Sequence, residues 1–208
     1  MFNFPTPYEI ATLIPAVVIA LTFHEYAHAV VAYKLGDPTA KYSGRLTLNP
    51  VSHVDPIGML MLFFAGFGWA KPVPVNPYNL RDPKRDMVLV SLAGPMSNLI
   101  LAVLFSFLFR IFYIFGSQAL IDVVYKIIWI NIVLAVFNML PIPPLDGSKI
   151  LAGIVPGDNS WLNYLEQYGF IILAILILTG MLGPILMFFI EPLWGLMEKF
   201  ITMGLILF

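Results

Sequence analysis

Four long apolar stretches divide the chain, and each is long enough to cross a membrane as a helix. They cover residues 8–34, 87–114, 119–140 and 166–190, and about 20 apolar residues of helix span the hydrocarbon core of a bilayer. A fifth stretch, residues 193–208, is shorter and carries Glu198 and Lys199, so it fits either a terminal span or an interfacial helix. The pattern predicts an α-helical integral membrane protein with about four to six transmembrane helices.

The segment between the first two apolar stretches has a different pattern. Residues 35–86 contain seven prolines and five glycines, and residues 44–49 alternate as a strand does before an Asn-Pro stop. From Ile57 to Trp69 the chain is apolar but too short to cross, as re-entrant and interfacial segments are. We therefore expect a small β-hairpin or re-entrant element here, beside a polar cavity that satisfies its backbone groups.

Composition supports a membrane protein and excludes several other classes. The 208 residues are 60% hydrophobic and 11% charged, and the mean hydropathy is +0.88, whereas soluble domains carry about 25% charged residues. We expect one membrane-embedded domain, residues 1–208, in contact with lipid. With a net charge of −1 and no basic run, nothing indicates binding to nucleic acid, and the composition leaves the oligomeric state open.

The positive charges predict the orientation. Seven of the eleven Lys and Arg residues lie at or between the facing ends of the first two apolar stretches. By the positive-inside rule this connection is cytoplasmic, which leaves the N-terminus outside. The first helix then runs inward, and the stretch 119–140 also ends on the cytoplasmic side. We expect a plasma membrane of bacterial or archaeal type.

The first apolar stretch contains three ionisable residues close together. His24, Glu25 and His28 form the pattern H-E-x-x-H and are the only side chains in residues 13–31 that carry charge near neutral pH. Such groups at membrane depth cost at least about 2.5–3.5 kcal/mol each when charged. The i, i+4 spacing places both imidazoles on one helix face, where they can share a metal ion, and the glutamate can act as general base on a water molecule.

A third metal ligand must come from elsewhere in the chain. The sequence has no cysteine, so a catalytic zinc ion would be held by nitrogen and oxygen atoms. Asp146 is the best candidate, because prolines end the preceding helix and Gly147 permits a sharp turn back towards the bundle. The competing ligands are His53, Asp55, Asp122 and Glu191.

Other interpretations of these residues stay open at this point. The histidines could be satisfied by neighbouring carbonyl groups, and Asp146 could belong to an ordinary Asp-Gly turn. A transporter or metal-handling protein could use the same cluster as a transit site, although we find no internal repeat of the kind that many transporters have. Glu25 separates these classes, because only the protease needs it as a base.

Three motifs together resemble the site-2 proteases, which are intramembrane zinc metalloproteases. The first is the zinc helix from His24 to His28, and the second is N-x-x-P-x-x-x-x-D-G at residues 138–147. The third is G-x-x-x-N at residues 94–98. The resemblance covers residues 20–150 and is that of a short form, since 208 residues leave no room for a PDZ or CBS domain.

The resemblance implies one zinc ion per chain, held by His24, His28 and Asp146, with Glu25 as the catalytic base. It also implies that Asn138 holds substrate near the zinc ion, and that the substrate is a single-span membrane protein cut within or near its transmembrane segment. Asn138 could instead be a helix-end hydrogen-bonding residue.

A helical substrate must unwind before it is cut, and the middle segment could bind the unwound stretch. We expect residues 44–49 and 66–76 to form a sheet edge for this purpose, with Gly44, Leu46 and Leu48 in contact with substrate. The alternative is a hairpin that only covers the metal. Asn98 could contact the middle segment or substrate, or serve in ordinary helix packing.

Overall fold

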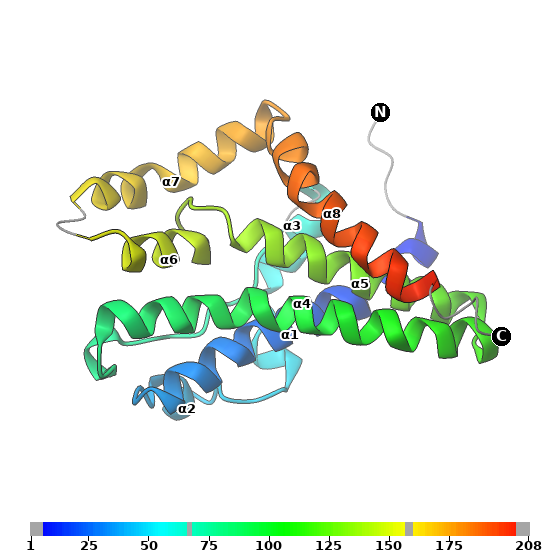
Figure 1. Ribbon diagram of the computed structural model, residues 1–208, viewed down its shortest axis with the longest axis horizontal. Coiled ribbons are helices and arrows are strands. Elements are labelled where there is room, and N and C mark those ends of the chain that lie inside the picture. Colours follow the sequence, from blue (N-terminus) through cyan, green and yellow to red (C-terminus); the bar gives the residue numbers. More distant parts are fainter. Residues whose placement is uncertain (1–5, 66–67, 157–159, 203–208) are drawn as a thin grey trace.

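The computed structural model describes residues 6–65, 68–156 and 160–202, and it is built from helices joined by turns (Figure 1). No β-strand occurs in these residues, and a single antiparallel bridge joins Val54 to Ala70. The helices are α1 (Pro7–Lys34), α2 (Thr39–Tyr42), α3 (Pro56–Ala65), α4 (Pro83–Phe115), α5 (Gln118–Asn138), α6 (Asp146–Ile154), α7 (Ser160–Leu178) and α8 (Leu182–Thr202), with short 3-10 turns η1 (Pro50–Ser52) and η2 (Pro77–Asn79).

Three helices form the centre of the fold. α1, α4 and α5 are long and apolar enough to cross a membrane, and they pack against one another side by side (Figure 1). Large apolar side chains such as Ile100, Phe107 and Ile111 are exposed along α4, and a row of this kind suits contact with lipid rather than water. The first three predicted spans therefore correspond to α1, α4 and α5.

The beginnings of these helices follow from local sequence. Thr6 caps α1 in a capping box with Glu9, and Pro7 takes the first helical position. Asp82 caps α4 in a similar way, since its side chain accepts a hydrogen bond from the backbone N–H of Arg85.

The apolar stretch at residues 166–190 does not form one continuous helix. The chain breaks after Leu178, where Gly180 adopts a positive φ of 72°, and α7 and α8 meet at a bend of 85°. Only together do they pass as a candidate fourth span. The predicted fifth stretch begins inside α8, whose Ile190 and Met197 are buried against α4 and α5.

The expected sheet between the first two spans does not form in the described residues. Residues 44–49 make turns and bends, beginning at Gly44 with φ of 67°, and the apolar run that follows forms the short helix α3. Gly66, which was expected to begin the second strand, lies outside the described residues. The backbone N–H of Lys71 still donates to the carbonyl oxygen of His53 beside the single bridge, but four prolines in residues 72–83 do not favour a longer ladder.

Candidate metal centre

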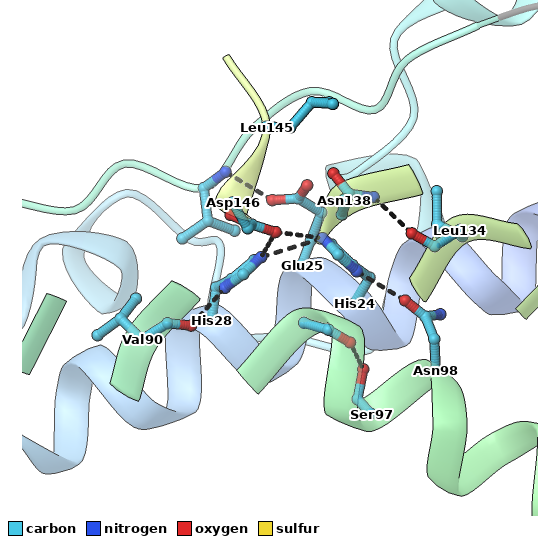
Figure 2. Close-up of polar contacts among 12 residues, drawn as sticks. His24, Glu25, His28, Val90, Ser97, Asn98, Leu134, Asn138, Leu145 and Asp146 are labelled. Carbon is cyan, nitrogen blue, oxygen red and sulfur yellow. Dashed lines mark hydrogen bonds and ion pairs between the residues drawn. The ribbon is translucent and has the colours of Figure 1, made fainter. Parts of the chain in front are cut away.

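Three side chains from two separate parts of the chain meet in the middle of the bundle (Figure 2). His24 and His28 lie on successive turns of α1, and Asp146 begins α6. Asp146 Oδ2 lies 3.1 Å from His24 Nε2 and 3.2 Å from His28 Nε2, and the two Nε2 atoms are 3.1 Å apart. All three residues are buried, with at most 7% of their surface exposed.

The other ring nitrogen of each histidine is already used as a donor. His28 Nδ1 lies 2.7 Å from the carbonyl oxygen of Val90, and His24 Nδ1 lies 2.7 Å from Asn98 Oδ1. Both partners are oxygen atoms that can only accept, so each Nδ1 carries the hydrogen, and in the neutral imidazole, the form that binds metal, each Nε2 presents a lone pair. The lone pairs of both histidines therefore face the carboxylate oxygen of Asp146.

This donor set fits a zinc ion. Three acceptor atoms with no hydrogen between them repel one another, and a cation placed among them removes that repulsion. Ligands at about 2.0–2.2 Å from a tetrahedral zinc ion lie roughly 3.3 Å apart, close to the triangle seen here, and three protein ligands leave one position open. Within the part of the chain that the structure describes, these three residues are the group that could hold a metal.

Two glycines allow the backbone to approach the site. A β-carbon added to Gly94 of α4 would lie 2.4 Å from His28 Nε2 and 2.6 Å from His24 Cε1. One added to Gly147 would lie 2.3 Å from the carbonyl oxygen of Met139. Only hydrogen fits at either position, so Gly94 lets α4 pack directly against the imidazoles and Gly147 lets the turn after α5 close on Asp146.

Glu25 follows His24 on α1 and contacts the middle segment of the chain. The residue is 8% exposed, and its Oε2 accepts a hydrogen bond of 2.7 Å from the backbone N–H of Val73. In residues 72–75 the prolines alternate with valines, so Val73 and Val75 supply the only backbone N–H groups there. One of these two donors is directed at the candidate catalytic carboxylate.

Buried polar groups hold this segment at both ends. At one end the Arg45 guanidinium donates to the carbonyl oxygen of Lys71. At the other end Asp37 accepts hydrogen bonds from the backbone N–H of Asn76 at 2.7 Å and from Asn79 Nδ2 at 2.9 Å, as well as from Thr39. These contacts fix the stretch that carries the Val73 N–H.

The surroundings lower the pKa of both anchors, Arg45 and Asp37, which disfavours the charged form of the arginine and favours the charged form of the aspartate. Burial lowers the pKa of Arg45, although the negative charge of Glu25 acts against this. Burial alone would raise the pKa of Asp37, but the hydrogen bonds that it accepts lower the pKa below the ordinary value of 3.8. Asp37 is therefore ionised at neutral pH, and its ionised form stabilises the fold.

Replacing Asp37 by asparagine is expected to loosen the segment over Glu25. An amide NH2 group would face the N–H donors that the carboxylate now accepts, and each unsatisfied buried group costs roughly 1–3 kcal/mol. Because the pKa of Asp37 is lowered by folding, its stabilisation is complete above about pH 4 and is lost as the pH falls through the folded value. Thermal unfolding of both proteins should therefore show a gap at neutral pH that shrinks in acid.

Asp55 provides a matched control for this substitution. Its side chain caps α3 by accepting from the backbone N–H groups of Ile57 and Gly58, and asparagine caps helices about as well as aspartate. Asp55→Asn should therefore change the unfolding temperature little. Equal losses in the two variants would show that Asp37 has no special anchoring role.

The remaining sequence candidates lie in several places. Asn138 ends α5 beside the cluster, and its Nδ2 donates to the carbonyl oxygen of Leu134 at 3.0 Å (Figure 2). The hydrogen bonds of Asn98 join it to His24, Ala20 and Asn131. Leu48 is 48% exposed. The proposed substrate contact of Gly44, Leu46 and Leu48 required a strand edge, and residues 44–49 form no strand.

The competing ligands do not join the cluster. His53 is fully buried, but its Nε2 lies 2.7 Å from the carbonyl oxygen of Thr47. Asp55 caps α3, and Asp122 accepts from the Tyr8 hydroxyl near the start of α1. Glu191 lies within α8.

An apolar cavity of about 550 Å³ lies among the helices. Its walls come from α1, α3, α5, α7 and α8, and they include Leu21 and Phe137, which are neighbours in sequence of the site residues.

Sequence reasoning missed several residues that shape the site. Gly94 was noted as part of a motif but not as a contact of the imidazoles, and Val73, Val90 and Asp37 were not singled out. The alternation of proline and valine at residues 72–75 was a usable signal for a segment with few N–H donors. The contact of Val73 with Glu25 had no local signal, because 48 residues separate them.

Known proteins resemble this chain along most of its length. Peptidase family M50 matches residues 114–178. The Bacillus subtilis (strain 168) protein YwhC, named as a zinc metalloprotease, is 47% identical over 83% of this chain and 81% of its own length. Rip2 of Mycolicibacterium smegmatis, named likewise, is 31% identical over 80% of this chain and 66% of its own.

A similar protein also occurs in an archaeon. MJ0611 of Methanocaldococcus jannaschii, also named as a zinc metalloprotease, is 30% identical over 73% of this chain and 75% of its own length. No solved structure matches the chain. No PDZ or CBS domain is found among the residues that the structure describes.

The Bacillus relative decides the assignment, because its identity of 47% extends over four fifths of both chains. The helices that are apolar enough to cross a membrane and the buried His, His, Asp cluster agree with it. The chain belongs to peptidase family M50, the site-2 proteases, which are intramembrane zinc metalloproteases.

Proposed function

We propose that His24, His28 and Asp146 hold one zinc ion per chain and that Glu25 is the catalytic base for hydrolysis of a peptide bond. The substrate is a single-span membrane protein, cut within or near its transmembrane segment. The observation that carries the proposal is the convergence of three lone-pair-bearing atoms within 3.2 Å of one another, with Glu25 next to His24 on the same helix.

Zinc bound at this position would lower the pKa of water and polarise the scissile carbonyl group. Glu25 takes the proton from the attacking water and later delivers it to the leaving amine. The Val73 N–H, which donates to one oxygen of the Glu25 carboxylate, holds that carboxylate in position and leaves its other oxygen for the water.

Asn138 is proposed as a donor to the substrate carbonyl. One hydrogen of its NH2 group is used by Leu134, and the second can be directed to the oxygen on which negative charge develops. The position of Asn138 at the end of α5, eight residues before Asp146, supports this role, because the same turn carries the carboxylate to the cluster.

The orientation is proposed from the charges. Seven of the eleven Lys and Arg residues are at or between the facing ends of α1 and α4, which favours a cytoplasmic position for that connection in a bacterial or archaeal plasma membrane. The N-terminus is then outside, and the metal centre is in the cytoplasmic half. We further propose that α3, with ten residues, is re-entrant or interfacial, and that α7 and α8 form one broken crossing among lipids.

Metal removal tests the proposal directly. Purified protein in liposomes is mixed with a panel of tagged single-span proteins, and the products are mapped by mass spectrometry. We expect one zinc ion per chain, cleavage within or near a transmembrane segment, loss of cleavage after chelation, and recovery on adding zinc. Protein that takes up no zinc, or that transports metal without cutting any member of the panel, would overturn the proposal.

A further inference from the structure

Two buried asparagines connect the metal-binding helix to α5. Asn98 and Asn131 are both fully buried, with an exposed fraction of 0%. Asn98 accepts from His24 Nδ1 at 2.7 Å and donates through Nδ2 to the carbonyl oxygen of Ala20 at 3.0 Å and to Asn131 Oδ1 at 2.8 Å. Asn131 Nδ2 in turn donates to the carbonyl oxygen of Ile127 at 2.8 Å.

Buried amides inside an apolar bundle are costly unless their hydrogen bonds are made. The hydrogen bonds described above satisfy both of these amides, and both side chains are buried away from the surface. The packing of α5 does not require an asparagine at position 131. The neighbouring Ile128 and Ile132 belong to the apolar core, and a leucine would fill a similar volume at position 131. The polar side chain at position 131 therefore indicates a role that depends on its hydrogen bonds.

The direction of each amide is set by backbone groups that can only accept. The Ile127 carbonyl requires the NH2 group of Asn131 on its side, which leaves Asn131 Oδ1 facing Asn98. Asn98 must then present its own NH2 group to Asn131 and to the Ala20 carbonyl. Only its oxygen is left for the histidine.

That oxygen decides which nitrogen of His24 carries the hydrogen. Facing an acceptor, Nδ1 must be the N–H, and Nε2 then has the lone pair that points at Asp146. If the Asn98 amide were turned over, its NH2 group would favour hydrogen on Nε2 of His24 instead. The metal centre would then lose one of its ligand atoms.

We propose that Asn131 is a positioning residue of the metal centre, which together with the Ala20 carbonyl group fixes the direction of the Asn98 amide and so keeps His24 Nε2 free to bind zinc. The inference rests on the proposed zinc site and extends it to a residue on a third helix. Asn131 acts through Asn98 and touches neither metal nor substrate. Removing a hydrogen-bonding partner behind a metal ligand lowers metal affinity by about 10–100-fold.

The test compares three variants with the wild type. Asn131→Leu keeps the volume and removes the acceptor. Asn131→Asp keeps the shape, and as a buried neutral acid it can donate to the Ile127 carbonyl and accept from Asn98. The control Ser106→Ala removes a fully buried hydroxyl that bonds only within α4, to the carbonyl oxygen of Ala102.

Zinc affinity is measured by competition with a chelator, and the visible spectrum is recorded for protein loaded with Co²⁺ in place of zinc. Thermal unfolding of the metal-free proteins is measured in parallel. We expect Asn131→Leu to lower zinc affinity by about 10–100-fold and to shift the Co²⁺ bands. Asn131→Asp should bind zinc within a few-fold of wild type, and Ser106→Ala should leave both measurements unchanged.

A purely structural role gives a different result. Asn131→Leu would then change thermal stability while zinc affinity and the Co²⁺ spectrum stayed as in wild type, and this would overturn the inference. If Asn131→Leu does not fold, Asn131→Ser is measured in the same way, because the serine hydroxyl is too short to reach Asn98. An Asn131→Ser protein that bound zinc as tightly as the wild type would also overturn the inference. Wild-type protein that binds no zinc would instead refute the metal site itself.

Discussion

Glu25→Gln is expected to abolish measurable cleavage while the protein keeps one zinc ion per chain. Glutamine has nearly the same shape and can still accept the hydrogen bond that the Val73 N–H donates at 2.7 Å, but it cannot take a proton from water. A general acid–base group contributes about 10²–10⁴-fold to a rate. Cleavage of a co-expressed single-span substrate should fall by that factor, with zinc content measured on the same preparations.

Glu9→Gln is the matched control on the same helix. Glu9 lies at the opposite end of α1, where it completes the capping box with Thr6, and glutamine serves in capping boxes as well as glutamate does. This variant should cut at the wild-type rate. If Glu25→Gln cut as fast as Glu9→Gln, another base would be needed, and if it lost its zinc, Glu25 would have a structural role as well.

The three central helices and the pairing of His24 with His28 on one helix face could be predicted from sequence because their signals are local. Apolar stretches of the right length predicted α1, α4 and α5, and the i, i+4 spacing placed His24 and His28 on one face. The sequence favours Asp146 because prolines and Gly147 end the helix before it, and because the predicted orientation puts both sites on the same side of the membrane. The structure brings these three residues together, as the spacing indicated.

The parts that were not anticipated depend on contacts between distant residues. The alternation in residues 44–49 favoured a strand, but no partner strand is present in the described residues and the positive φ of Gly44 starts a turn instead. Residues 166–190 were apolar throughout, so hydropathy did not reveal the break at Gly180. The hydrogen bonds of Asp37 join residues about 40 positions apart, and no local pattern encodes them.

Gly94 is the position where the ordinary rule for helix stability should reverse. Alanine is about 1 kcal/mol more favourable than glycine in a helix interior, and Gly94 lies inside α4. Its missing side chain, however, leaves the space that the imidazoles of His24 and His28 occupy, since an added β-carbon would lie 2.4 Å from His28 Nε2. The backbone of α4 or the histidines must move to admit a methyl group.

We therefore expect Gly94→Ala to lower zinc affinity by on the order of 100-fold, the upper end of what a disturbed ligand environment costs, and to lower the unfolding temperature because overpacking costs about 1–3 kcal/mol. Gly195→Ala is the control. Gly195 also lies inside a helix, α8, but an added β-carbon there would meet no atom within 4 Å. That variant should keep its zinc and unfold at the same or a higher temperature. If both variants bound zinc equally well, the close approach of α4 would not be what shapes the metal centre, and the ligands would have to be positioned by α1 and α6 alone.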